Sequence, residues 1–339
     1  MSNQRLTQVD ALRGIAALLV VGFHFTTRFD QTFPGQLPSN FSVPWGHLGV
    51  NLFFSISGFV IFLTLDRART GMDFVVSRFS RLYPTYWVAI ALTFTITHTL
   101  GPATITVPVQ TAWLNGLMFH GLLGIPSVDG AYWTLEVELL FYGWMLLLFL
   151  CKQLRFVHHW LAAALALRWA YTLTAEHLGI ELSWRVQQLL ILQHLPWFVL
   201  GIAVATARAA TDQAQRQRAL WSGAWALLTL VGIEGLGYAA LGLGLSGLVW
   251  WAAEGRLPGL GFSTWAWLGA VSYPLYLLHE HVGWYMMLKV MENGGSRGLG
   301  MLTALVTALA LAEAVRRGVE QPAMQAIRRA WSRRRRGSA

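Results

Sequence analysis

Cysteine and charged side chains are both scarce in this chain of 339 residues. The single cysteine, Cys151, excludes an intramolecular disulfide and a metal cluster held by several cysteines. Charged residues make up 12% of the chain, whereas a soluble domain carries about 25%. Apolar residues reach 55%, and there are 17 tryptophans, a residue type enriched at membrane interfaces. The composition excludes an ordinary soluble protein and predicts a membrane protein.

Apolar stretches long enough to cross a bilayer recur along the whole chain. A transmembrane helix needs about 20 mostly apolar residues, and the sequence predicts about ten such helices in an all-α, polytopic fold. The first follows Arg5 without a small-residue cleavage site, so we expect it to be a retained anchor. The predicted spans are residues 11–28, 47–65, 83–100, 132–151, 158–175, 187–207, 217–233, 236–252, 264–289 and 298–317.

The distribution of positive charge orients these spans. Most arginines and lysines fall on one side if both termini lie inside, as the positive-inside rule requires. We therefore expect a bacterial inner (cytoplasmic) membrane, with both termini cytoplasmic. Residues 1–322 form the predicted membrane-embedded domain, and 323–339 a basic cytoplasmic tail. Most of the excess behind the net charge of +9 lies in this tail, which suits anionic lipid headgroups rather than a nucleic acid.

The long connection 101–131 contains no lysine or arginine, which places it outside. Its Trp113, Phe119 and Leu122 predict a re-entrant or interfacial segment rather than a free loop. On the second span, Asn51, Ser55 and Gly58 share one helix face, a spacing typical of close helix packing.

Ionisable residues inside spans are costly and are candidates for function. Arg13 and His24 lie eleven residues apart on the first span, which puts them about 20° from the same face and about 16 Å apart along the axis. A snorkelling arginine and a packing histidine are equally open interpretations. Arg78 and Arg81, in an inside loop before Tyr83-Pro84, share a helix face. Arginine forks suit phosphates, although an inside anchor explains the pair as well.

Two further acidic motifs stand in the outer half of the predicted spans. Glu136 and Glu138 are two residues apart, so only one of them can face a shared centre on a helix. His279, Glu280 and His281 could suggest zinc. The H-x-x-x-H helix spacing is absent and there are no cysteine ligands, so we expect no metal site.

Taken in order, these motifs resemble the acyltransferase-3 family of bacterial membrane O-acyltransferases. The resemblance runs from residue 10 to residue 322, nearly the whole chain. The matching stretches are Asp10-Ala11-Leu12-Arg13-Gly14 with His24, Gly49 to Phe54 with Ser57-Gly58-Phe59, Arg78 and Arg81 before Tyr83-Pro84, Trp133 to Tyr142, Ser272-Tyr273 to His279, and Glu320-Gln321-Pro322.

The resemblance implies transfer of an acyl group, often acetyl, from cytoplasmic acyl-CoA to a hydroxyl of a carbohydrate or other envelope molecule. Under it, Arg13 and His24 match the family's functional pair, and Glu138 matches its acid. Arg78 and Arg81 match its basic motif at the inner face. The expected partners are acyl-CoA as donor substrate, the hydroxyl-bearing acceptor and membrane lipid, with no metal.

The sequence departs from the family pattern at three positions, which leaves the role of each carboxylate open. Asn51 stands where the family often has an acid, Thr134 replaces a serine, and Glu136 is an additional acid. A transporter or flippase would also carry buried ionisable residues in ten spans, although no inverted repeat is present.

The mechanistic hypothesis assigns the general base to His24 and its orientation to Glu138. Arg78 and Arg81 would hold the CoA phosphates. Arg13 would bind the polar part of the donor or the developing oxyanion. A covalent acyl-histidine relay remains a second possibility.

Overall fold

The computed structural model describes residues 6–36, 39 and 41–337, and every regular element in these ranges is helical. Clustering of contacts divides the chain into two compact units. The first contains the described part of Met1–Leu12 together with Val50–Gly71 and Val137–Phe262. The second contains the described parts of Arg13–Gly49, Met72–Glu136 and Ser263–Ala339. The predicted all-α class is therefore confirmed for the described chain.

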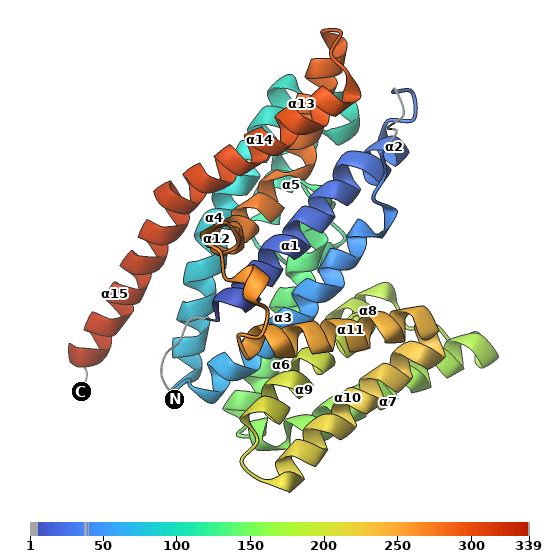
Figure 1. Ribbon diagram of the computed structural model, residues 1–339, viewed down its shortest axis with the longest axis vertical. Coiled ribbons are helices and arrows are strands. Elements are labelled where there is room, and N and C mark those ends of the chain that lie inside the picture. Colours follow the sequence, from blue (N-terminus) through green and yellow to red (C-terminus); the bar gives the residue numbers. More distant parts are fainter. Residues whose placement is uncertain (1–5, 37–38, 40, 338–339) are drawn as a thin grey trace. The chain divides into compact units, whose positions relative to one another are not determined.

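The first unit packs its helices through small residues. Gly58 of α3 and Gly201 of α9 meet so closely that a Cβ on either would overlap the backbone of the other helix. This contact confirms the close packing predicted from Asn51, Ser55 and Gly58. The helix α10 packs on α7, α9 and α11 (Figure 1). The helices are α3 (Gly49–Asp66), α6 (Trp133–Leu150, in this unit from Val137), α7 (Val157–Leu178), α8 (Trp184–Leu189), α9 (Leu195–Ala209), α10 (Gln213–Glu234) and α11 (Leu236–Ala253).

One predicted span, 187–207, is two helices in the structure. It ends as α8 at Leu189 and resumes as α9 at Leu195, which at 15 residues is about 22 Å long. The buried Arg168 of α7 donates to the carbonyl oxygens of Leu192 (2.6 Å) and Gln193 (2.5 Å), and it also pairs with Glu234. Carbonyls at a helix break have no intrahelical partner, so the guanidinium supplies the bonds that the backbone has lost.

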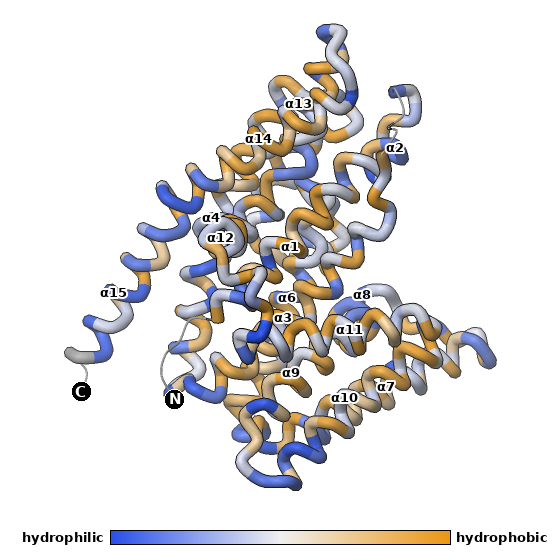
Figure 2. Tube along the Cα trace, in the orientation of Figure 1, coloured by the Kyte–Doolittle hydropathy of each residue, from blue (hydrophilic) through white to orange (hydrophobic). Residues whose placement is uncertain are grey.

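The second unit contains the remaining helices, and in it α14 packs against α12 and α13. In Figure 2 the apolar colouring of α14 gives way to hydrophilic residues along α15. The elements are α1 (Thr7–Phe23, in this unit from Arg13), a π-helix (His24–Arg28), α2 (Phe29–Thr32), a short turn (Pro44–Leu48), α4 (Gly71–Leu100), α5 (Val109–Asn115), three single turns (Ala103–Ile105, Gly121–Leu123, Gly130–Tyr132), α12 (Ser263–Leu278), α13 (Glu280–Glu292), α14 (Arg297–Val315), a second π-helix (Arg316–Glu320) and α15 (Gln321–Gly337).

The predicted inside loop around Arg78 and Arg81 is wrong, because both residues lie on α4. This helix has 30 residues and is about 45 Å long, which exceeds the ~30 Å hydrocarbon core. Hydropathy marks where a helix enters the lipid and not where the helix begins, so the expected start at residue 83 was too late. The two arginines therefore sit on a rigid helical extension rather than on a flexible connection.

The connection 101–131 folds into packed turns, in line with the prediction that it is not a free loop. Buried Asn115 donates to the carbonyl of Pro126 (2.9 Å) and accepts from the amide of Val128 (2.9 Å). His120 contacts the hydroxyl of Ser127 at 2.9 Å. Burial lowers the pKa of His120 to about 4, so this imidazole is neutral at physiological pH. The fixed turns carry Asp129 and Gly130 toward α13.

Five helices in the described chain are long and apolar enough to cross a membrane, and Leu195–Ala209 is a shorter apolar helix. The membrane character is confirmed, whereas ten spans and two cytoplasmic termini stay predictions, as do the boundaries 1–322 and 323–339. The predicted tail is helical as far as Gly337, and its last two residues lie outside the described ranges. The spans are Thr7–Thr32, Pro44–Asp66, Gly130–Leu150, Leu236–Ala253 and Arg297–Arg335.

Replacing Arg168 by Met should destabilise the protein by about 3–5 kcal/mol, because it leaves a half-buried Glu234 and the helix-break carbonyls without their partner. Thermal unfolding of the purified protein in detergent measures this change. Arg208→Met is the matched control, since Arg208 forms a half-exposed pair with Glu254 and should cost little. Equal losses for the two variants would contradict the structural role of Arg168.

Candidate functional site

A change of helix type presents His24. The α-helix α1 ends at Phe23 and continues as a five-residue π-helix from His24 to Arg28. Such π segments alter the backbone bonding and are frequent at functional sites. Side chains bind the carbonyls of this segment: Trp284 donates to the oxygen of His24 (2.9 Å), and Arg297 reaches those of Phe25 and Thr26. The backbone at His24 is thus held from α13 and α14.

A second irregularity, the break between α12 and α13, presents His279. The break lies within the predicted span 264–289, and it leaves carbonyls at the end of α12 without helical partners. Nδ1 of His279 binds the oxygen of Tyr276 (2.8 Å), and the hydroxyl of Tyr132 donates to that of Leu277 (3.1 Å). His279 is fully buried. Its ring is therefore both a helix cap and a fixed element of the site.

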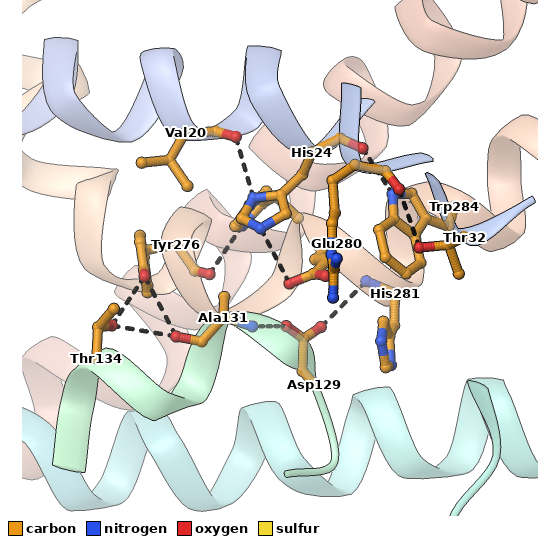
Figure 3. A network of polar contacts seen from close by, with 12 residues as sticks. Val20, His24, Thr32, Asp129, Ala131, Thr134, Tyr276, Glu280, His281 and Trp284 are labelled. Atoms are coloured by element: carbon orange, nitrogen blue, oxygen red, sulfur yellow. Dashed lines mark hydrogen bonds and ion pairs between the residues drawn. The ribbon is translucent and has the colours of Figure 1, made fainter. Parts of the chain in front are cut away.

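The imidazoles of His24 and His279 are in contact. Nδ1 of His24 lies 3.0 Å from the carbonyl oxygen of Val20 and 2.9 Å from Nε2 of His279. A carbonyl only accepts hydrogen bonds, so Nδ1 carries the proton in His24, and likewise in His279, where it faces Tyr276. The neutral tautomer of His24 then has its lone pair on Nε2. Figure 3 shows this nitrogen directed toward Glu280.

Glu280 lies on the base side of His24. Its Oε2 is 3.4 Å from Nε2 of His24 and has no hydrogen-bond partner among the described residues. Arg28, at the end of the π-helix, lies close enough to act on both groups. A proton gained by His24 would convert this contact into a buried ion pair, which stabilises the imidazolium.

Asp129 supports Glu280 from the loop before α6. Its two carboxylate oxygens accept from the backbone amides of Ala131 (3.0 Å) and His281 (3.1 Å) (Figure 3). The carboxyl groups of Asp129 and Glu280 are close enough to interact, and both side chains are buried. Two adjacent buried carboxylates repel one another when both are ionised. A Cβ on Gly130 would stand 2.5 Å from Oε1 of Glu280, so a glycine is required for this approach.

The two acids of α6 fall in different units. Glu138, the predicted orienting acid, lies in the first unit, where it accepts from the hydroxyls of Ser57 (2.6 Å) and Tyr142 (2.5 Å). Glu136 lies buried in the second unit and accepts from the amide of Leu122 (3.2 Å). The structure thus gives Glu136 a role in holding the loop. The catalytic role of Glu138 stays a prediction.

The predicted arginines occupy helices of the second unit. Arg13 is half-buried on α1, in the regular helix that leads to His24. Arg78 and Arg81 are half-buried on α4, and Arg81 lies near Glu320. The structure brings His24 together with His279 and Glu280, which the sequence suggested only in the context of a metal. No described group of three His, Cys, Asp or Glu has the arrangement of a metal site.

Asp129 and the position of Glu280 beside His24 were missed from the sequence. Asp129 and Glu280 lie about 150 residues apart in the chain. They come together only because the loop that carries Asp129 packs on α13, which the sequence does not reveal. One local signal was available: a glycine directly after an acid at the end of a loop with no basic residue.

Comparisons with known proteins identify the family of this chain. The family model of the acyltransferase domain matches residues 6–315. "Protein 2 in picA locus" of Rhizobium radiobacter is 34% identical over 135 residues, which are 38% of this chain and 63% of that protein. This chain therefore covers less than two thirds of that relative. No solved structure matches. The match over nearly the whole length shows that this multi-pass membrane protein belongs to the acyltransferase-3 family.

Proposed function

We propose that this protein transfers an acyl group, in the first instance acetyl, from cytoplasmic acyl-CoA to a hydroxyl of a carbohydrate or other cell-envelope acceptor. The observation that carries the proposal is the contact of half-buried His24 with buried His279 and Glu280, in which Nε2 of His24 has a lone pair and an acidic neighbour. This arrangement is what proton removal from a hydroxyl requires.

The proposed reaction uses this geometry as follows. The acceptor hydroxyl oxygen attacks the thioester carbonyl while Nε2 of His24 takes the hydroxyl proton. The carbon–sulfur bond then breaks, and the imidazolium returns the proton to the departing thiolate. The products are the ester and free CoA. His279 accepts a hydrogen bond from Nδ1 of His24, which keeps the proton on that nitrogen and the lone pair on Nε2. A hydrogen bond to one ring nitrogen in this way determines which nitrogen of a catalytic histidine can react.

Glu280 stabilises the imidazolium while His24 holds the proton. Arg13 is assigned to the donor's polar part or the developing oxyanion, Glu138 to a supporting role in its own unit, and Arg78 and Arg81 to the CoA phosphates.

The membrane placement belongs to the same proposal. Ten spans with both ends in the cytoplasm of a bacterial inner membrane would put Arg78 and Arg81 on the side where acyl-CoA is found. The bias of arginine toward the predicted inside segments supports this orientation. Residues 71–82 of α4 precede the predicted span 83–100 and carry both arginines, which supports entry of the donor along that helix.

Substituting His24 by Ala should lower CoA release from acetyl-CoA by about 10²–10⁴-fold, the contribution of a general base. The rate is measured on purified protein with a thiol-reactive dye that detects released CoA. A membrane extract supplies the acceptor. His98→Ala, an exposed histidine on α4, is the matched control and should leave the rate unchanged. Release of CoA at the wild-type rate by the His24 variant would contradict the assignment of His24 as the general base. Absence of CoA release from wild type, together with movement of an envelope precursor across the membrane, would favour a transporter.

Substituting Gly130 by Ala should lower kcat by about 10²-fold, because the added methyl displaces the Glu280 carboxyl, and displacements of about 1 Å in an active site have effects of this size. Acyl-CoA binding should not change. Gly298→Ala on α14 is the control, since nothing lies within 4 Å of the added carbon. A Gly130 variant with wild-type kcat would show that the position of Glu280 is unimportant, and Glu280→Gln would test the same point through charge.

A further inference from the structure

The basic helix α15 is attached to α4 at defined points. Asp73 of α4 accepts from Nε1 of Trp331 (2.8 Å) and from Nη1 of Arg335 (2.9 Å). Two turns further along α4, Ser80 accepts from Nε of Arg328 (3.3 Å). Asp73 and Ser80 are seven residues apart, as are Arg335 and Arg328, so the two helices run antiparallel over this stretch. The predicted tail is therefore, in its described part, a helix attached to α4 through side chains.

This docking brings three arginines together. Arg328 lies close enough to Arg78 and Arg81 for their charges to act on one another. Glu320 lies near Arg81 and also near Arg316. Like charges held together repel by an amount that depends on the local dielectric, so an anion bound between the guanidinium groups would stabilise the cluster.

The orientation of Arg328 suits a ligand. Ser80 is buried, and its oxygen engages Nε of the guanidinium. Among the described residues, no contact involves the two terminal nitrogens of Arg328. These nitrogens form the fork that binds phosphate oxygens in pairs. The guanidinium of Arg329, the next residue, donates to Gln325 on its own helix, and the side chain is exposed.

We propose that Arg328 joins Arg78 and Arg81 in a three-arginine site that binds the phosphate groups of the acyl-CoA donor. This inference rests on the proposed function, because it names a further residue of the donor site. The ligand chemistry is a phosphate cluster on a nucleotide. The phosphate of a lipid headgroup has the same chemistry and is the competing source for this helix.

The test uses the full-length protein in nanodiscs of neutral lipid and three donors: acetyl-CoA, acetyl-dephospho-CoA and acetyl-pantetheine, which has no phosphate. Arg328→Gln should raise the Kd for acetyl-CoA by roughly 10-fold or more, as expected for loss of a charge-assisted fork. The effect should shrink with acetyl-dephospho-CoA and vanish with acetyl-pantetheine. Arg329→Gln is the matched control and should bind like wild type. Arg328→Lys, which keeps the charge without the fork, should fall between.

The outcomes separate the two levels of the proposal. If Arg328→Gln binds acetyl-CoA as tightly as the wild-type protein does, the three-arginine site is overturned. The acyltransferase assignment then stays in place. Wild type that binds no acyl-CoA overturns both. A variant that binds acetyl-CoA normally but loses affinity for vesicles with anionic lipid assigns Arg328 to the membrane surface. Equal losses for acetyl-CoA and acetyl-pantetheine show an effect on folding, which contradicts a phosphate contact.

Discussion

Backbone carbonyls freed where helices break inside an apolar environment must be bound by side chains, since lipid offers them no hydrogen bond. The candidate site depends on this constraint. The break between α12 and α13 is bridged by His279, whose Nδ1 binds the carbonyl of Tyr276. That bond determines which nitrogen of His279 accepts, and so which nitrogen of His24 donates. A structural requirement of the helix end thereby sets the reactive tautomer.

The same constraint has a purely structural solution elsewhere in the chain. Arg168 binds the carbonyls of Leu192 and Gln193 at the break before α9 and is neutralised by Glu234. The two breaks differ in what stands beside them. Arg168 is paired with its acid, whereas His279 contacts a second imidazole, that of His24, which faces Glu280. A buried polar side chain therefore does not by itself indicate a functional site. The lone pair on Nε2 of His24, which no hydrogen bond among the described residues uses, is the feature that does.

Much of this architecture could be predicted from the sequence because hydropathy and motif spacing are local. The helical class, the small-residue packing at Gly58 and the candidate pair Arg13 and His24 came from such patterns. The break at His279 could not, because a span of apolar residues looks continuous whether or not its backbone is. The approach of Asp129 to Glu280 could not either, since it requires the packing of a loop 150 residues away in the chain. The start of α4 was misplaced because hydropathy reports the membrane edge.

The central claim is that His24 rests as the tautomer with its proton on Nδ1 and its lone pair on Nε2. Nitrogen NMR of protein with isotope-labelled histidine measures this state directly, with the His24 signals assigned by their loss in His24→Ala. The structure predicts a protonated Nδ1 and an unprotonated Nε2 in wild type, with His279 in the same form. A proton on Nε2 of a neutral His24 would contradict the account, because that nitrogen could not then accept a proton from the acceptor hydroxyl.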